Sequence, residues 1–299
     1  MLGSVLDAED AVQEALFRAW KGRERFDERS SLKTWLYRIA TNVCLDVLAS
    51  TARRRLRPVD LPPGPADVHE AMILTKRPRE AWIEPIPDTL ALPAEGTTNP
   101  EEYALLREGI RLAFVAALQY LPPRQRAVLL LTQVLDWSAT EVAASLDMTV
   151  AGVNSALQRA RRTLFLRQGV PAPRELSISQ REVVEQYVSA FLAYDIGALV
   201  QLLHDDATLC MPPFDVWIKG RRSIGQWMLT LGAGCQDSVL VPVHAAGGAP
   251  AFAQYRHAGR TAWAILVLDC TGDRIGAITT FLDVEALFPR FGLPMRWAR

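Results

Sequence analysis

The sequence lacks an excess of charge of either sign, because its 299 residues include 33 basic and 33 acidic side chains. A net charge of zero argues against a protein that is basic throughout. Any nucleic-acid surface must therefore come from local clusters of cationic side chains. The length and the apolar share of 49% are sufficient for two or three domains, each with its own core.

Cysteine and histidine are scarce, at four residues each. The four cysteines lie far apart and show no CxxC spacing: Cys44, Cys210, Cys235 and Cys270. This pattern fits neither a disulfide framework nor a zinc site, so we expect reduced thiols, no metal and no cofactor. Apolar runs also stay below the roughly 18 residues of a membrane span, and no signal peptide follows Met1. We therefore expect a cytoplasmic protein with no membrane partner.

A helical hairpin is the strongest local pattern that the sequence does contain, between Leu135 and Arg167. Ser138 and Glu141 have the spacing of a capping box at the start of the first helix. Asp147 falls at the sharp turn and is a residue type that tolerates a positive φ. Thr149 can cap the second helix.

The second helix of this hairpin has two different faces. Its apolar residues follow helical spacing: Val153, Ala156, Leu157, Ala160 and Leu164. The opposite face carries donors for base edges and phosphates and no carboxylate: Asn154, Ser155, Gln158, Arg159, Arg161 and Arg162. We favour a DNA-binding helix-turn-helix. The alternative is a hairpin with a solvated basic face, because arginine also suits the end of a helix dipole.

Two further helices are predicted near the N-terminus. Residues 7–20 form an amphipathic helix that begins without a cap, and its predicted buried side is Ala11, Val12, Ala15, Leu16 and Trp20. Ser30 or Ser31 caps the next helix, in which Leu32, Trp35, Leu36, Ile39, Val43 and Val47 share a stripe. Aromatic and polar residues then precede a run of arginines: Trp35, Tyr37, Asn42, Arg53, Arg54, Arg55 and Arg57. Such a set suits unstacked bases, although alone it fits a core aromatic stripe with a solvated helix end somewhat better.

The composition of the sequence changes twice in the middle of the chain. Residues 58–100 are rich in proline and irregular, and their apolar residues, Trp82 among them, indicate a linker that docks on something. Residues 101–168 predict a compact four-helix unit, in which a single helix runs from Glu101 until the Pro122–Pro123 pair ends it.

The last third, from residue 177, predicts a separate α+β domain with a curved sheet. Helix 179–194 comes first, and the β-like runs are 216–219, 239–245, 251–255, 261–270 and 274–281, interrupted by a helix at 221–231. We expect these consecutive strands to be antiparallel. His204, Asp205 and Asp206 fit a cap and turn at a helix end better than an acid–base cluster.

Two long motifs resemble the extracytoplasmic-function (ECF) sigma factors of bacteria. The first motif, which resembles their domain two, is DAEDAVQEALFRAW followed by RFDERSSLKTWLYRIATNVCLD. The second, which resembles their domain four, is LPPRQRAVLLLTQVLDWSATEVAASLDMTVAGVNSALQRARRTL. The C-terminal third resembles SnoaL-like cone folds through its two-helix opening, HDDATLCMPP and WIKGRRSIGQW. The resemblance implies domain two at 1–57, a linker at 58–100, domain four at 101–168 and a SnoaL-like domain at 177–299. Members of the family carry a helix before DAED that is missing here, which implies either a misassigned start or a truncated chain. An in-frame helix encoded upstream of Met1 would restore a full domain two.

This resemblance implies partners and roles for particular residues. Core RNA polymerase would bind the helix that bears Asp10, Gln13, Glu14 and Arg18. Phe26 and Asn42 would line the pocket for a flipped minus-ten base, and Arg53, Arg54 and Arg55 would hold backbone phosphates. The second helix of the hairpin would enter the major groove at the minus-thirty-five element. There Asn154, Ser155 and Gln158 would contact base edges, and Arg159, Arg161 and Arg162 phosphates.

The resemblance therefore implies a non-enzymatic promoter-recognition subunit that is regulated by its own C-terminal domain. That domain would fold back on the linker around 82–87 or on domains two and four. Its aromatic and apolar residues suit either a cone-shaped pocket for a small molecule or, somewhat better, an ordinary α+β core: Tyr187, Phe191, Met211, Trp217, Trp227, Tyr255, Trp263 and Phe281. The alternatives are a stand-alone ligand-responsive helix-turn-helix regulator and a cone-fold enzyme tethered to a DNA-binding module.

Overall fold

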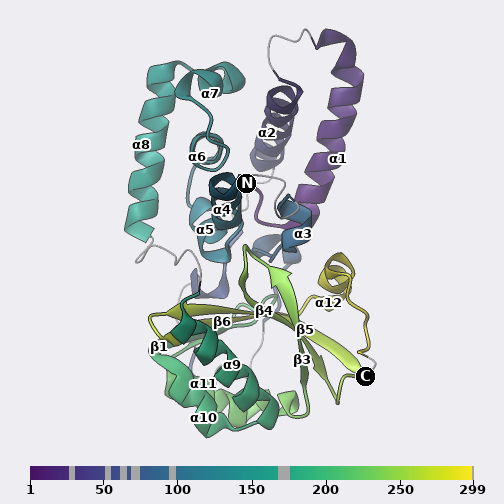
Figure 1. Cartoon of the computed structure of the whole chain (residues 1–299), viewed down its shortest axis with the longest axis vertical. Helices are drawn as coiled ribbons and strands as arrows, with labels where there is room; N and C mark the ends of the chain where they lie inside the picture. The colour runs from purple at the N-terminus through teal and green to yellow at the C-terminus, as the bar shows by residue number, and fades with distance from the viewer. Residues whose placement is uncertain are drawn as a thin grey trace. The chain divides into compact units, whose positions relative to one another are not determined.

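The computed structural model of the chain describes residues 1–26, 31–50, 55–60, 66–68, 75–93, 99–167 and 176–297. Two compact units divide the chain (Figure 1). The N-terminal unit consists of residues 1–55, 83–86 and 91–172, and the C-terminal unit of residues 56–82, 87–90 and 173–299. The proline-rich segment is therefore shared between the two units and is not a separate spacer.

The first two helices of the N-terminal unit are α1 (Val5–Gly22) and α2 (Leu32–Ser50), with a short 3-10 turn at Arg23–Arg25 after α1. The expectation of an uncapped first helix is wrong, because the Ser4 hydroxyl accepts a hydrogen bond from the Asp7 N–H at 3.3 Å. Ser31 caps α2 by accepting from the Thr34 N–H at 3.0 Å. Ser30 lies outside the described residues.

Alanines form the contact surface of α1 against α2. Ala11, Ala15 and Ala19 are buried at a spacing of four residues. The prediction that Val12, Leu16 and Trp20 share this buried side is wrong, because they are 54%, 57% and 63% exposed. Each of them follows one of the alanines directly, which turns its side chain about 100° around the helix axis and away from α2.

Five helices follow in the N-terminal unit: α4 (Pro100–Gly109), α5 (Leu112–Leu118), α6 (Pro123–Gln133), α7 (Ala139–Leu146) and α8 (Val150–Arg167). The predicted continuous helix up to Pro122 is in fact α4 and α5, because Arg111 is extended (φ −64°, ψ 138°). The break follows Gly109, where a Cβ would lie 3.0 Å from a methyl of Val134. A side chain at Gly109 would therefore require Val134 to shift by a few tenths of an ångström.

The C-terminal unit is built on one six-stranded sheet in the order β2-β1-β6-β5-β4-β3. Its strands are β1 (Leu203–Cys210), β2 (Trp217–Lys219), β3 (Val239–Ala245), β4 (Ala249–Arg256), β5 (Thr261–Thr271) and β6 (Arg274–Phe281). All neighbouring pairs are antiparallel except β1 and β6, which are parallel. Sequence analysis missed β1 and therefore missed the parallel pair.

Helices α9 (Ile178–Ala193), α10 (Ile196–Leu202) and α11 (Arg221–Leu229) pack with the sheet into the main core of this unit (Figure 1). Leu266 and Leu268 of β5 belong to that core. The alternate residue Ile265 is fully buried but lies outside this cluster. The period of two along β5 thus separates two apolar faces of the sheet. The chain ends with α12 (Val284–Leu287) and a 3-10 turn at Phe288–Phe291.

Parts of the proline-rich segment belong to the C-terminal unit through specific contacts. The short turns Pro58–Asp60 and Arg79–Ala81 lie in these parts, and Leu56 forms an isolated bridge with Trp82. The Asp88 carboxylate, at the start of α3 (Asp88–Ala91), accepts from the N–H groups of Gly247 and Gly248 at 2.8 and 3.0 Å. The predicted docking of the linker is confirmed by these contacts.

Candidate functional sites

The hairpin of α7 and α8 has the local structure that its sequence predicts. Ser138 and Glu141 form a reciprocal capping box at the start of α7. Asp147 takes the left-handed conformation (φ 52°) that turns the chain between the helices. The Thr149 hydroxyl then accepts from the Gly152 N–H at 3.0 Å and caps α8. The capping box, the left-handed turn at Asp147 and the Thr149 cap therefore define how α7 connects to α8.

The two faces of α8 also separate as expected. Val153, Ala156, Ala160 and Leu164 are buried, whereas Asn154, Ser155, Gln158, Arg159, Arg161 and Arg162 are all exposed. The Arg161 guanidinium donates to the Gln133 side-chain oxygen of α6 at 3.0 Å, which steadies it across the surface. This face therefore presents amide, hydroxyl and guanidinium donors on a rigid helix, as recognition of a major groove requires.

The residues expected at an unstacked base share one face of α2. Trp35 and Asn42 are seven residues apart, two helical turns, so they lie on the same stripe. The Phe26 ring packs on Trp35 with ring centroids 5.2 Å apart. Asn42 is exposed. An aromatic pair and an amide thus follow one another along this face. Arg53 and Arg54 lie outside the described residues.

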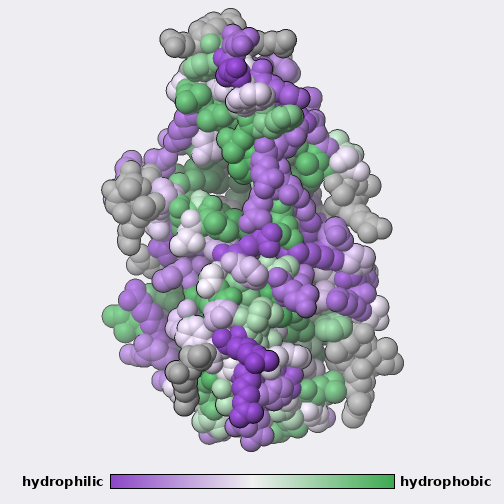
Figure 2. All heavy atoms as spheres, turned by 90° about the vertical axis from the view of Figure 1, so that its right-hand side faces the viewer, coloured by the Kyte–Doolittle hydropathy of each residue, from purple (hydrophilic) through white to green (hydrophobic). Residues whose placement is uncertain are grey.

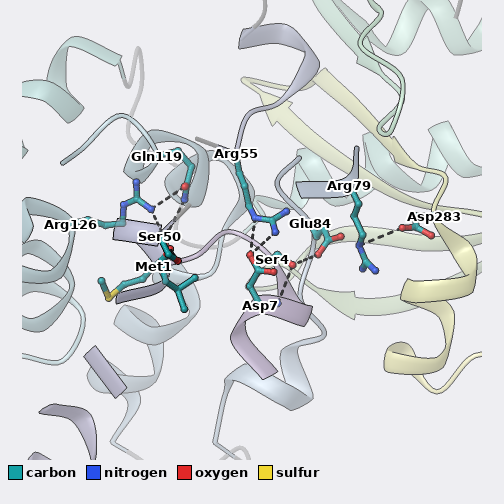
Figure 3. A network of polar contacts seen from close by, with 11 residues as sticks. Met1, Ser4, Asp7, Ser50, Arg55, Arg79, Glu84, Gln119, Arg126 and Asp283 are labelled. Atoms are coloured by element: carbon teal, nitrogen blue, oxygen red, sulfur yellow. Dashed lines mark hydrogen bonds and ion pairs between the residues drawn. The ribbon is translucent and has the colours of Figure 1, made fainter. Parts of the chain in front are cut away.

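Arg55 is not placed as a phosphate contact. Its side chain is only 7% exposed, and its guanidinium is ion-paired with the Asp7 carboxylate at 2.5 Å (Figure 3). The expectation for Arg55 is therefore corrected: a buried guanidinium that holds the first turn of α1 is not offered to DNA. Sequence analysis missed this ion pair because Asp7 and Arg55 are 48 residues apart in the chain.

A second buried polar cluster surrounds Arg126 of α6. Its guanidinium donates to the Met1 carbonyl at 2.6 Å and to the Gln119 side-chain oxygen at 3.0 Å (Figure 3). Burial lowers the pKa of Arg126 to about 10, so the group remains charged at neutral pH. Nearby, the Ser4 hydroxyl donates to the Glu84 carboxylate at 2.5 Å. These contacts attach residues 1–4 to the later helices of the same unit.

The predicted polymerase-binding residues lie on the outer surface of α1. Asp10, Gln13, Glu14 and Arg18 are all exposed, and Arg18 pairs with Glu14 and with Asp46, each at 2.7 Å. Sequence analysis missed the apolar residues among them: Val12, Leu16, Phe17 and Trp20. Figure 2 looks onto the side that bears α1 and shows apolar and charged residues interspersed over its upper part. Four large exposed apolar residues on one helix are typical of a protein-binding surface.

Helix α2 contacts the helix-turn-helix within the N-terminal unit. The Tyr37 and Trp137 rings meet edge to face with centroids 6.3 Å apart. Arg38 lies 3.8 Å from the Asp147 carboxylate. Both partners of that ion pair are about half exposed or more, so it contributes little to stability. In this structure the two DNA-directed regions are therefore in direct contact.

The C-terminal unit contains a cavity of about 270 Å³ between the sheet and its helices. Five of the residues predicted for a pocket line it: Tyr187, Phe191, Met211, Trp227 and Trp263. A shift in the pairing register of β4 and β5 accompanies the placement of Trp263, because Gln254 pairs with Ala264 and Tyr255 with Ala262. Trp263 is left between these pairs and lines the cavity together with Leu266.

Three predicted pocket residues lie elsewhere. Tyr255 packs on Phe288 and Trp297, and its hydroxyl donates to the Pro294 carbonyl at 2.9 Å. Phe281 is buried opposite Ile265, and Trp217 pairs with Cys210 on the short β2. The alternation of side chains along the strands accounts for Tyr255, since the cavity residues Gln254 and Arg256 are its immediate neighbours.

His204, Asp205 and Asp206 do not gather at the cavity. They lie on β1, where Asp205 pairs with Arg221 at 3.0 Å and Asp206 with Lys219 at 3.2 Å. Both carboxylates are more than 70% exposed. The cap-and-turn interpretation is wrong as well, because this segment is a strand. Within the described residues no group of three metal-ligating side chains comes together, and no helix is long and apolar enough to cross a membrane.

Comparisons with known proteins match three parts of the chain to sequence families. Residues 1–54 match Sigma-70 region 2, residues 111–164 match Sigma-70 region 4, and residues 179–261 match the nuclear transport factor 2 (NTF2) domain. The first two matches contain α1 with α2 and the helix-turn-helix. The third contains most of the cavity lining.

Relatives from Mycobacterium tuberculosis align with most of the chain. It is 42% identical over 304 residues to the ECF RNA polymerase sigma factor SigG, across 98% of this chain and 79% of the relative. It is 30% identical over 212 residues to the ECF RNA polymerase sigma factor SigJ, across 70% of this chain and 58% of that relative. The crystal structure of SigJ has the same fold, with a TM-score of 0.60 over 94% of this chain and 89% of that one at 21% identity.

Proposed function

The chain belongs to the ECF RNA polymerase sigma factors, whose function is promoter recognition and transcription initiation, and we propose that it performs that function through α1, α2 and α8. We retain the sequence-based boundaries for its parts: region 2 within 1–57, the linker at 58–100, region 4 at 101–168 and the NTF2-like domain at 177–299. In this proposal the chain is a cytoplasmic, non-enzymatic subunit of the polymerase.

The exposed face of α8 is the observation that carries the DNA-binding part of the proposal. Asn154, Ser155 and Gln158 are placed to read base edges in the major groove, and the three exposed arginines to hold phosphates or guanine. The Phe26–Trp35 pair and Asn42 support a second contact, in which a flipped base stacks on an aromatic ring and hydrogen-bonds to an amide.

Promoter binding requires the two regions to separate. Minus-ten and minus-thirty-five elements are about 25 base pairs apart, which corresponds to roughly 85 Å at ~3.4 Å per base pair. Tyr37 and Trp137 are in ring contact, so the two regions cannot span that distance as they stand. We therefore interpret this arrangement of the N-terminal unit as a closed form, which opens when polymerase binds.

The exposed apolar face of α1 supports the polymerase contact. Trp20 is 63% exposed, and the guanidinium of Arg23 lies over its ring, 5.0 Å from the ring centroid. Aromatic residues of this kind commonly carry most of the binding free energy at an interface. We expect the binding of core polymerase to bury this face together with Gln13 and Glu14.

Substitution of Trp20 tests the polymerase contact. We expect Trp20→Ala to weaken binding of core RNA polymerase by about 2 kcal/mol or more, since it removes a central aromatic anchor. Ile178→Ala is a matched control, because Ile178 is 78% exposed on the C-terminal unit. Fluorescence titration of labelled protein with core enzyme measures both affinities. Equal affinities for the two variants would remove α1 from the proposed interface.

The linker provides a route for regulation by the C-terminal domain. Between regions 2 and 4, Arg77 pairs with Asp215 at 3.0 Å, and the Arg77 N–H donates to the Pro213 carbonyl at 3.0 Å. Asp88 is held by two backbone N–H groups of the β3–β4 turn. A linker held at these points shortens the free chain between regions 2 and 4, so its release would favour their separation.

Substitution of Asp88 tests this regulation in the full-length protein. We expect Asp88→Ala to raise promoter-dependent transcription several-fold, because two charge-assisted hydrogen bonds of the linker are lost. Thr89→Ala is the control, since Thr89 is exposed next to Asp88. Single-round transcription with saturating core polymerase is the measurement. Unchanged transcription with Asp88→Ala would exclude this linker contact as a regulatory element.

A further inference from the structure

The cavity of the C-terminal unit has one charged group in its lining, the guanidinium of Arg256. The other lining residues are apolar or neutral, and none of them is a carboxylate or a histidine. Arg256 has no ion-pair partner within the described part of the chain. A buried or half-buried cation without a counter-ion is costly, so an anion that entered the cavity would be stabilised there.

The Arg256 side chain is held in place by its neighbours. Its guanidinium lies over the Trp263 ring, 4.1 Å from the ring centroid. On another side it fills the space beside Gly234, where a Cβ would come within 1.7 Å of a guanidinium nitrogen. Because the group is packed between a ring and a glycine backbone, little conformational freedom remains to be lost when a ligand binds.

Unpaired donors in the lining point to a ligand with acceptor atoms. The Arg256 Nε–H and the Trp227 indole N–H are both buried and have no hydrogen-bond partner. Such orphaned donors are rare in folded proteins and call for an acceptor. The nearby Cys235 does not supply a charge, because burial raises the pKa of its thiol, although the Gln254 hydrogen bond and the Arg256 charge lower it.

Size and shape limit the ligand further. A volume of 270 Å³ corresponds to about nine waters at ~30 Å³ each, hence to a ligand of roughly ten non-hydrogen atoms. The walls are aromatic at Tyr187, Phe191 and Trp227, which favours an apolar, preferably aromatic body.

We propose that this cavity binds a small carboxylate with an apolar body, whose carboxylate accepts from Arg256 and whose body packs against the aromatic walls. The two sides of the site have distinct tasks: the guanidinium selects the anion, and the walls select the size of the body. The site lies within the C-terminal unit alone. A negative result for ligand binding would therefore leave the proposed promoter function intact, and a negative result for promoter function would leave this site intact.

The wall of this cavity is also continuous with the linker contacts. Met211 and Phe214 line the cavity, and Phe214 forms an isolated bridge with Lys76 of the linker. The next residue, Asp215, pairs with Arg77. A ligand that presses on Phe214 therefore acts on the segment to which the linker is attached.

The test uses the full-length protein and three probes of one shape: hydrocinnamate, its neutral amide hydrocinnamamide, and phenylpropylammonium. Isothermal titration calorimetry measures their affinities. We expect hydrocinnamate to bind saturably and about 10- to 100-fold more tightly than the amide, the range of a charge-assisted hydrogen bond, and the ammonium not to bind. Equal binding of acid and amide, or no saturable binding of the acid up to millimolar concentrations, would overturn the proposal.

Two variants and a control locate the site. Arg256→Met keeps an unbranched apolar stem and removes the charged guanidinium, and Gly234→Ala displaces the guanidinium. Both are expected to abolish the preference for acid over amide while binding of the amide persists. Arg260→Met is the control, because Arg260 is exposed on the β4–β5 turn and lies outside the lining. Loss of the preference in this control as well, or its survival in Arg256→Met, would contradict the assignment.

Discussion

Helix α1 of the N-terminal unit and strand β5 of the C-terminal unit differ in where they place their large apolar residues. On α1 of the N-terminal unit, Leu16 and Trp20 are 57% and 63% exposed, while alanines form the helix contact. In the C-terminal unit, Leu268 and Ile265 are fully buried in the sheet. The arginines proposed for binding differ in the same way, since Arg159 and Arg162 are exposed on α8 whereas Arg256 lines a cavity.

This difference indicates two kinds of recognition in one chain. A helix that buries small residues and exposes large or charged ones can bind extended partners such as DNA and polymerase. A unit that encloses aromatic walls and one cation can bind only a molecule that fits within it. The contrast predicts that one substitution will have different consequences in the two units.

Replacing a leucine by alanine in each unit gives the largest expected contrast. Leu268→Ala should reduce the free energy of unfolding of the C-terminal unit by about 2–5 kcal/mol, because it leaves a cavity in a closed core. Leu16→Ala should change stability by less than about 0.5 kcal/mol. Urea unfolding followed by circular dichroism measures both. Comparable losses would show that α1 is packed more tightly than its exposure indicates.

Arg55→Met tests the assignment of Arg55 to the interior. We expect a loss of about 1.5–3 kcal/mol in the stability of the N-terminal unit, since the Asp7 carboxylate loses its charged partner. Methionine preserves much of the packing of the arginine stem. Thermal unfolding and DNA titration are measured on the same preparation. Weaker DNA binding with unchanged stability would show that Arg55 contacts DNA and does not stabilise the interior.

Arg159→Ala tests the recognition face of α8. We expect DNA binding by the polymerase complex to weaken by about 1–3 kcal/mol, the range for an arginine contact in the major groove. Stability should be preserved, because the side chain is exposed. Arg222→Ala, an exposed arginine on the C-terminal unit, is the control. If both variants bind alike, the face of α8 is not a DNA contact.

The last prediction concerns the reactivity of Cys210 in the interior of the C-terminal unit and no effect on stability or binding. Burial raises the pKa of its thiol to about 12, so at pH 8 only roughly one molecule in ten thousand carries the reactive thiolate. Iodoacetamide should therefore label Cys210 far more slowly in the folded than in the unfolded protein. Mass spectrometry of labelled peptides measures this ratio, and equal rates would contradict a closed core.

Local patterns predicted the helix-turn-helix because its structure is set by neighbours in the sequence. The residues that shape it each have a hydrogen-bond partner three or four residues away in the sequence: Ser138, Glu141, Asp147 and Thr149. All four behave as expected. The face of α8 follows from its helical period in the same way. The exposed polar face of α8 could therefore be predicted from the sequence, and the role of its residues at DNA stays a prediction.

Long-range features could not be predicted in this way. The ion pair of Arg55 with Asp7 depends on the packing of α1. Strand β1 was not predicted because His204, Asp205 and Asp206 are typical of a turn. The strand tolerates them because Asp205 and Asp206 are solvent-exposed and His204 is only half-buried. Trp263 lines the cavity next to a register shift between β4 and β5. The regular alternation of side chains along a strand does not predict such a shift.

Transcription from a randomised promoter library is the most direct test of the central claim that this chain leads polymerase to two promoter elements. Core polymerase transcribes the library with or without the full-length protein, and the templates of the transcripts are sequenced. We predict enrichment of two elements, near minus ten and minus thirty-five, only when the protein is present, and loss of the upstream element with Arg159→Ala. If the protein selects DNA equally well without polymerase and promotes no transcript, it is a stand-alone regulator and the account is contradicted.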